Sequence, residues 1–408
     1  MKTTTDRSRL GSRLQMARGW YWAFGVNGDP YAMLLCGQDD EPGRWYEQIR
    51  SASPALFRSR SGAFVVTGYE AAARVLDGPG FTRAAGETAA DWAQPFLDVR
   101  TGAGPPLAAV EELVAEYRAL LPRPGTRFDL MRDLAREVPV CGLAARLAPG
   151  GVAARLAPGG VAARLAPGGV AARLAADAVT ARLAPDGEDA RRLAPDGEDA
   201  RALAALLRSS AGALDARLTP QLLAVTEQTL AALAGLRERA GADGVLAGAG
   251  CETAANTVCN AVLATLRTPG LAGRLADDPD LADRIVAETL RTAPPVHLEC
   301  RYATAARTVH GTTLAEGDEV VVAVAAANRD PEAFAAPDRF DVDRPDDPPA
   351  LTSGLGHQDG LDAFAARHAV AALRALATTL PRMTLAGPLV HRRRSPVLRG
   401  ISRCPVEI

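Results

Sequence analysis

The stretch ETLRTAPP, from Glu288 to Pro295, decides the fold. Its first four residues place Glu288 and Arg291 three positions apart, on one face of a helix, where their side chains can form a charge-assisted pair. The helix must end just after them, because a residue that precedes proline disfavours the helical conformation. A Glu-x-x-Arg pair is common by itself, so its meaning depends on what surrounds it in the sequence.

Four further segments follow or precede this pair in a fixed order. Downstream come RYAT from Arg301, VVAVAAANRDPEAF at 321–334 and PDRFDVDR at 337–344, and upstream comes LAGAGCETAANTVCNAVL at 246–263. The ordered set resembles the bacterial members of the cytochrome P450 superfamily. The resemblance is specific from about Val245 to the end of the chain and weaker over 40–140.

The resemblance implies a mainly α fold, the triangular prism of that superfamily with a small β region, built as one domain over residues 1–408. In such a fold Glu288, Arg291 and Arg339 are expected to form a buried structural network. Ala and Leu at helical spacing after residue 215 agree with a mainly α chain.

Local patterns predict several elements. An amphipathic helix is expected within 41–52, and a strand, a turn and a helix that ends at a glycine within 62–82. A hairpin is expected around Ala315–Gly317, followed by a buried strand, and the last long helix is expected over 361–380.

A nine-residue repeat interrupts this pattern. The unit AARLAPGGV occurs three times from Ala144 to Val170 and then decays up to about Glu198. Nine residues with a Pro-Gly breaker are too few for the unit of a solenoid. We interpret 144–198 as an insertion tolerated at the surface, with a binding array as the alternative.

The family's haem loop has a counterpart here that lacks its key residue. The family pattern is Phe-Gly-x-Gly-x-His-x-Cys-x-Gly. Gly354 and Gly356 match its first two glycines, whereas Ser353 and Gln358 stand in the places of its phenylalanine and histidine. Gly360 occupies the place of the cysteine whose thiolate ligates haem iron. We therefore expect no haem or other cofactor.

Two residues are compatible with haem binding. Arg301 matches an arginine that binds a haem propionate in the family. His357 could be proposed as a substitute iron ligand, although it lies three residues before the ligand position. The five histidines and six cysteines show no metal-site spacing, so no metal site is expected either.

Glu252 and Thr253 match the acid–alcohol pair that relays protons to oxygen in active members of the family. Without a thiolate-ligated iron this pair has no oxygen to protonate. We predict an inherited pair without function, in which the Thr253 hydroxyl bonds a carbonyl one turn back along the helix and bends the helix.

Composition excludes several partners. The formal net charge is −2, which does not favour nucleic acid. There is no run of 18 apolar residues, so no membrane span is expected. The N-terminus lacks the apolar segment of a signal peptide, which favours the cytoplasm.

The whole chain also resembles the auxiliary proteins that accompany macrolide desosaminyltransferases. That resemblance implies a non-catalytic activator that binds and stabilises a glycosyltransferase. Two alternatives remain open: a nucleotide-4-keto-6-deoxyhexose 3,4-isomerase, with Glu252 as the one candidate base, and a haem protein with an unusual ligand.

An aromatic cluster near the N-terminus spans Trp20 to Phe24. It has two interpretations, an anchor in the core or a docking surface for the partner. Trp20 and Trp22 are the candidate docking residues.

Overall fold

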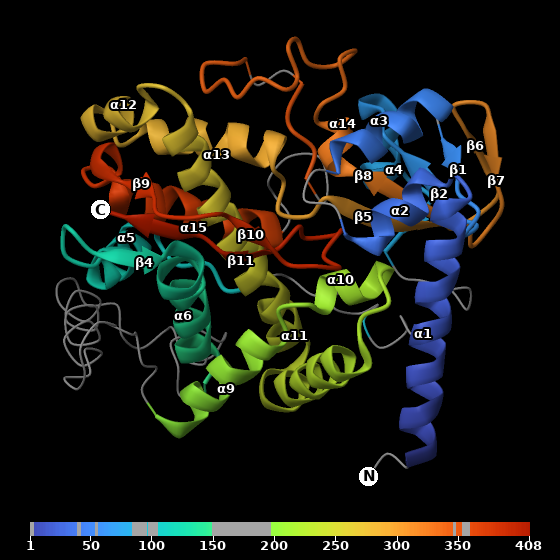
Figure 1. Cartoon of the computed structure of the whole chain (residues 1–408), viewed down its shortest axis with the longest axis horizontal. Helices are drawn as coiled ribbons and strands as arrows, with labels where there is room; N and C mark the ends of the chain where they lie inside the picture. Colours follow the sequence, from blue (N-terminus) through green and yellow to red (C-terminus); the bar gives the residue numbers. More distant parts are fainter. Residues whose placement is uncertain are drawn as a thin grey trace, which may run out of the picture.

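The computed structural model describes residues 4–38, 42–53, 56–83, 96, 105–148, 197–345, 348–352 and 360–408. Figure 1 shows helices clustered around one long helix, α11, with a small sheet region at one side. The helices are α1 (Thr4–Val26), α2 (Pro30–Cys36), α3 (Gly43–Ala52), α4 (Tyr69–Asp77), α5 (Val110–Leu120), η2 (Met131–Ala135), α6 (Glu137–Leu147), α9 (Glu198–Ser209), α10 (Ala213–Leu218), α11 (Leu223–Arg267), α12 (Leu271–Asp277), α13 (Leu281–Thr292), α14 (Val324–Ala327), α15 (Gly360–Leu376) and η4 (Leu380–Arg382).

The helix α11 forms the axis of the molecule, and α15 packs along it (Figure 1). Its second half, from Gly244 to Val262, is buried almost without a break and consists largely of Ala, Gly, Cys and Thr. Such small side chains let neighbouring helices approach closely. The helix is interrupted at Ala240 and Gly241, where Gly241 has a φ of 63°, which disfavours any residue with a Cβ.

The largest sheet has five strands in the order β1-β2-β8-β5-β3. Only the β2–β8 pair is parallel; the other three pairs are antiparallel. A second sheet has the order β4-β12-β9, and two further pairs are β10-β11 and β6-β7. The strands are β1 (Phe57–Arg58), β2 (Phe64–Val66), β3 (Phe81–Thr82), β4 (Arg127–Asp129), β5 (Leu298–Ala303), β6 (Arg307–Val309), β7 (Thr312–Leu314), β8 (Glu319–Ala323), β9 (Thr384–Leu385), β10 (Val390–His391), β11 (Ile401–Arg403) and β12 (Pro405–Glu407).

The predicted local elements are confirmed except for the hairpin. The helices α3 and α15, the β2–α4 unit that ends at Gly78, and the buried strand β8 lie where the sequence places them. The hairpin turn is at His310–Gly311, not at Ala315–Gly317. Both turn residues have positive φ, 46° and 81°, as a tight two-residue hairpin turn requires. Residues 315–318 instead connect two different sheets.

The repeat falls almost entirely outside the described residues. Its first unit begins inside α6, which ends at Leu147, and α9 starts at Glu198. The interpretation of 144–198 as a surface insertion therefore stays a prediction.

Within the described ranges, no helix is long and apolar enough to cross a lipid bilayer.

Candidate functional site

Side chains at the start of α15 lie directly against α11. A Cβ built on Gly250 of α11 would lie 2.7 Å from Pro105 Cγ and 3.5 Å from both Leu361 Cδ2 and Phe364 Cδ1 of α15. Leu361 and Phe364 are 3% and 2% exposed. The two helices thus meet through apolar packing next to Glu252 and Thr253, the acid–alcohol pair that the resemblance identifies.

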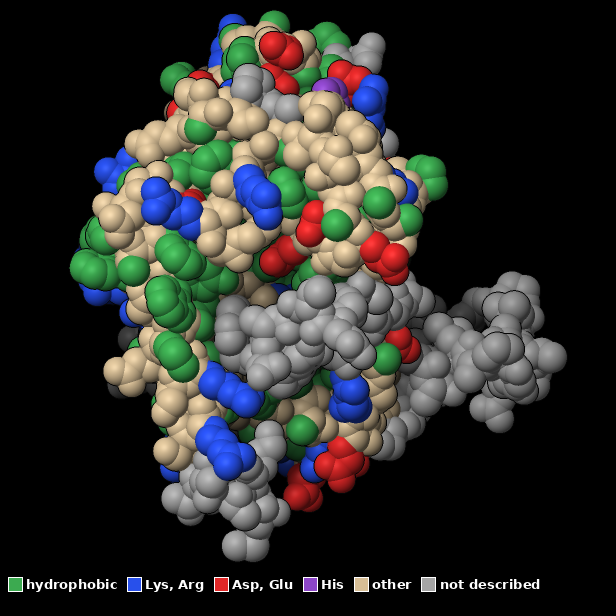
Figure 2. Space-filling view, turned by 90° about the vertical axis from the view of Figure 1, so that its right-hand side faces the viewer, with side chains coloured by type: hydrophobic (Ala, Val, Ile, Leu, Met, Phe, Trp, Pro, Cys, Tyr) green, Lys and Arg blue, Asp and Glu red, His purple; other side chains and the backbone are tan. Residues whose placement is uncertain are grey.

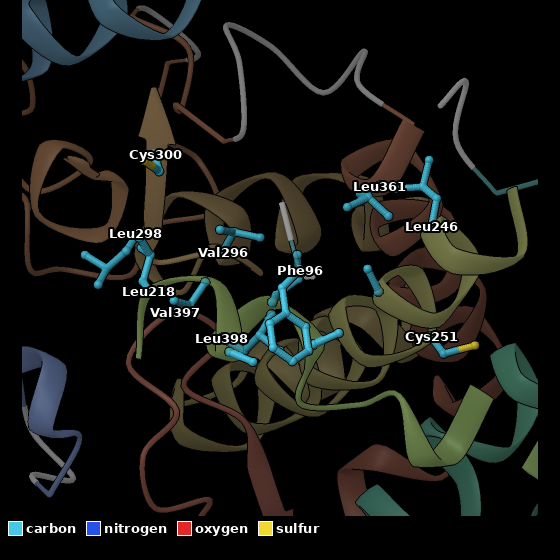
Figure 3. Close-up of a cluster of buried hydrophobic side chains, with 14 of the residues drawn as sticks. Phe96, Leu218, Leu246, Cys251, Val296, Leu298, Cys300, Leu361, Val397 and Leu398 are labelled. Carbon is cyan, nitrogen blue, oxygen red and sulfur yellow. The ribbon is translucent and has the colours of Figure 1, made fainter. Parts of the chain in front are cut away.

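The same apolar cluster continues from this contact toward β5 and the chain after β10. Figure 3 shows Leu246 and Leu361 at one end, Leu298 and Val397 at the other, and Phe96 between them. All of these side chains belong to one cluster of buried residues. The packing is dense enough that Phe96 is only 1% exposed.

Gly360 is the first residue of α15 and offers no side chain to a ligand. The other loop remnants, Gly354, Gly356, His357 and Gln358, lie outside the described residues. What they do, including ligation of iron by His357, stays untested by the structure.

Arg301 is paired within its own strand. Its Nη1 donates to an Oε1 of Glu299, two residues earlier on β5, and to the carbonyl of Cys300 at 3.0 Å. Both charged side chains are almost fully buried, and Arg83 Nε lies 3.5 Å from the same Glu299 oxygen. The guanidinium that the resemblance assigns to a haem propionate is therefore paired with a carboxylate of the chain itself.

Glu252 is clamped by two arginines from distant segments. Its Oε1 accepts from Arg392 Nη2 at 2.5 Å and Arg136 Nη2 at 3.2 Å, and its Oε2 accepts from Arg136 Nε at 3.3 Å. The carboxylate is 2% exposed. Burial opposes its ionisation, but the charges and hydrogen bonds of the two arginines outweigh it and lower the pKa of Glu252.

The clamp has a structural consequence. It ties α11 to the junction of η2 and α6 through Arg136 and to the C-terminal segment through Arg392. A carboxylate held ionised by two cations is a poor base, because binding a proton would break both pairs.

The hydrogen bond predicted for Thr253 is present. Its Oγ1 donates to the Gly250 carbonyl at 3.0 Å, one turn back along α11. The helix is nonetheless not interrupted there, since the interruption lies at Ala240 and Gly241.

The predicted structural network exists with one change of membership. Glu288 accepts two 2.8 Å bonds from Arg291, and Arg291 also donates to the carbonyls of Asn328, Pro337 and Arg339. Arg339 contributes only its carbonyl, because its own side chain is 72% exposed.

Arg344 supplies the second guanidinium instead. Its Nε lies 3.5 Å from Glu288 Oε1, and its side chain is 13% exposed. Both arginines lie in PDRFDVDR, so spacing alone does not distinguish them, and the turn at 336–344 decides which one faces the helix.

Asp215 is a buried anchor that sequence reasoning missed. Its carboxylate accepts from Ser395 Oγ at 2.6 Å, Val397 N at 2.9 Å and Leu398 N at 3.1 Å. Burial raises its pKa to about 6 despite these bonds. Nothing in the segment GALDARL marks an acid whose partners lie 180 residues away.

The N-terminal aromatics divide between core and surface. Trp20 and Trp22 on α1 are 58% and 62% exposed, so the interpretation as a core anchor is wrong for these two residues. Tyr21 packs against the core, and Phe24 is half-buried and stacks with Trp20 at 5.8 Å between ring centroids.

Taken together, the described residues do not fit a haem held by a thiolate. Gly360, at the position that the resemblance assigns to the ligand, has no side chain, and Arg301, which the resemblance assigns to a propionate, is paired with Glu299. What the region retains is the framework around such a site: the long helix, the Glu288–Arg291 network and the helix α15.

Comparison with known proteins agrees with this framework. The cytochrome P450 family profile matches residues 242–359. The chain is 45% identical to the cytochrome P450 family protein EryCII of Saccharopolyspora erythraea, over 100% of both chains. The chain therefore belongs to the cytochrome P450 family.

Particular members resemble it along their full length. Protein AknT of Streptomyces galilaeus is 35% identical over 98% of this chain and 96% of its own. Among solved structures, ligand-free CYP164A2 of Mycobacterium smegmatis superposes with a TM-score of 0.58 at 26% identity, covering 93% of this chain and 99% of that one. The mainly α P450 fold expected from the sequence is thus confirmed.

Proposed function

We propose that this chain is a non-catalytic activator and stabiliser of a glycosyltransferase. The transferase would move an amino-deoxysugar of the desosamine type from a nucleotide diphosphate onto a macrolide-like aglycone. The proposal is supported by the resemblance to auxiliary proteins of such transferases and by the full-length likeness to EryCII and AknT.

The observation that carries the non-catalytic part is the Glu252 clamp. Glu252 is the one acid that the inherited motifs offer as a base, and Arg136 and Arg392 hold it ionised and buried. This also speaks against the isomerase alternative, which needs a base able to take a proton from carbon. An activator needs no reacting group, because binding to the competent state of a partner raises the population of that state.

The test combines the purified chain with a desosaminyltransferase. We expect the rate of transfer from the nucleotide-bound amino-deoxysugar to the macrolactone to rise when the chain is added, and the chain alone to turn over no sugar. A haem absorbance band in the purified chain would support the haem alternative, and conversion of a nucleotide-bound 4-keto-sugar by the chain alone would support the isomerase.

We further propose that the partner docks on α1. This helix runs along the edge of the molecule and projects beyond it (Figure 1), and Figure 2 views the molecule from that side, where hydrophobic side chains are exposed. Besides Trp20 and Trp22, α1 exposes Met16 at 58% and Val26 at 55%. Among the residues of α1 whose burial the structure describes, only Leu14 and Gly25 are buried. An exposed apolar surface of this kind is typical of an interaction site.

The two tryptophans face different directions. They are two residues apart, which is about 200° around a helix. Trp20 lines a hollow of about 360 Å³ together with Ala17, Phe24 and Arg60. Trp22 lies on the other flank of the buried stripe formed by Leu14 and Tyr21. Single substitutions can therefore tell which flank meets the partner.

We expect Trp20→Ala or Trp22→Ala to weaken complex formation with the transferase about a hundredfold, the effect of losing about 2.8 kcal/mol at an interface anchor. The measurement is size-exclusion chromatography combined with titration calorimetry. Leu385→Ala, which removes an exposed apolar side chain on β9, is the control and should bind normally. If both tryptophan variants bind as wild type, the docking surface lies elsewhere; if both melt early, the rings stabilise the fold.

A further inference from the structure

A second site lies where the C-terminal segment meets α2 and α3. A pocket of about 240 Å³ is bounded by Met33, Leu34 and Gly37 at α2, by Trp45 of α3 and by residues 389–399. The C-terminal segment is held there by a hydrogen bond from Arg394 N to the Gly37 carbonyl at 2.9 Å. In Figure 1 this segment (red) runs from β10 toward α2.

The described lining of the pocket is rich in basic side chains. His391, Arg392, Arg393 and Arg399 line it, and none of its lining residues that the structure describes is an acid. Arg392 forms an ion pair with Glu252. Arg393 and Arg399 form no ion pair with any described carboxylate, and the buried Nε of Arg399 makes no hydrogen bond.

Two other basic side chains, His297 and Arg329, lie near Arg399. Burial, together with Arg399 and Arg329, lowers the pKa of His297 well below its ordinary range, so this imidazole is neutral. Burial is also the main cause of the lowered pKa of Arg329, to which Arg399 adds, and Arg329 is paired with Asp338 at 3.4 Å. Neither neighbour brings a carboxylate that would neutralise Arg399.

The backbone that presents Arg399 is rigid and strained. Asp215 fixes the turn through Ser395, Val397 and Leu398 as described above. Arg394 and Arg399 both have positive φ, 59° and 49°, although neither is a glycine. Strain held in place by buried bonds is common at binding sites, because it aims a side chain that would otherwise turn away.

We propose that this pocket binds a diphosphate group. At about 240 Å³ the pocket has room for a diphosphate group. Guanidinium groups match phosphate oxygens in a two-pronged geometry. The group can belong to inorganic pyrophosphate or to a nucleoside diphosphate. The site is separate from α1, and the proposal does not depend on the glycosyltransferase.

The test is titration calorimetry of the purified chain with inorganic pyrophosphate and, separately, with thymidine diphosphate. We expect saturable binding of at least one of them, weakened at least tenfold in Arg399→Gln and in Arg393→Gln. Arg382→Gln removes an exposed arginine on η4, outside the pocket, and should change nothing. Equal affinity for both probes indicates recognition of the diphosphate alone, and tighter binding of the nucleotide indicates that the nucleoside also contributes.

Three outcomes would overturn the proposal. The first is no saturable binding of either probe. The second is an equal loss in Arg382→Gln, which would indicate attraction by overall charge. The third outcome involves the acids Asp39, Asp40 and Glu41. They lie between the lining residues Gln38 and Pro42 in the sequence and are outside the described residues. Binding only after all three are changed to amides would mean that the chain's own acids exclude the ligand. Thermal melting of each variant verifies that it is folded.

Discussion

Glu288→Ala is expected to destabilise the protein by about 3–5 kcal/mol and to leave little of it soluble. Removing one partner of a buried ion pair strands the other charge in the interior. Here it strands Arg291, which is 2% exposed, and it also removes the acceptor for the backbone N–H of Asp341 at 2.9 Å. Native proteins are stable by only about 5–15 kcal/mol, so the loss is a large share of the total.

The measurement is soluble yield together with urea unfolding followed by circular dichroism. Glu70→Ala is the matched control, since it breaks a pair with Arg74 in which both side chains are more than 60% exposed. Such surface pairs contribute about 0–1 kcal/mol. A soluble Glu288→Ala protein with an unchanged unfolding midpoint would show that the network does not stabilise the fold.

Glu252→Gln is expected to cost about 2–4 kcal/mol of stability at neutral pH, because it neutralises the carboxylate on which two arginines converge. The effect is smaller than for Glu288 because the Arg136 and Arg392 side chains are 21% and 28% exposed and keep part of their hydration. Glu112→Gln, which loses a half-exposed partner of Arg146, is the control.

The pH dependence of this effect has a definite sign. The pKa of Glu252 is lower in the folded chain, so the clamp stabilises fully above the ordinary Glu pKa of about 4.3 and is lost as the pH falls through the lowered value. The stability difference between wild type and Glu252→Gln should therefore be constant from pH 6 upward, as a rough bound, and shrink in acid. A difference that grows in acid would contradict the clamp.

The same variant distinguishes a structural role of Glu252 from a catalytic one. If Glu252 only holds the fold, Glu252→Gln should still stimulate the transferase at a temperature where it remains folded. A folded variant that binds the partner but has lost all stimulation would return Glu252 to an enzymatic role.

The sequence predicted the positions of the main helices and strands well, and the side-chain pairs between distant segments less well. The order of motifs from Val245 onward placed α11, α13, β8 and α15, because those elements are read from local periodicity and breakers. It also placed Glu288 with Arg291, which are neighbours on one helix face.

Pairs between distant segments were not predictable in the same way. Arg136 and Arg392 meet Glu252 across 116 and 140 residues, and Asp215 meets Ser395 across 180. No pattern in a single sequence marks such pairs, because arginine is abundant throughout the chain. The choice of Arg339 rather than Arg344 was wrong for a related reason, since it depends on the path of a turn.

The place of β12 in its sheet has a consequence for the order in which that sheet can assemble. Pro405–Glu407 is the middle strand between β4 and β9. The backbone hydrogen bonds of β4 and of β9 both run to β12, so this sheet exists only once the C-terminal segment is in place.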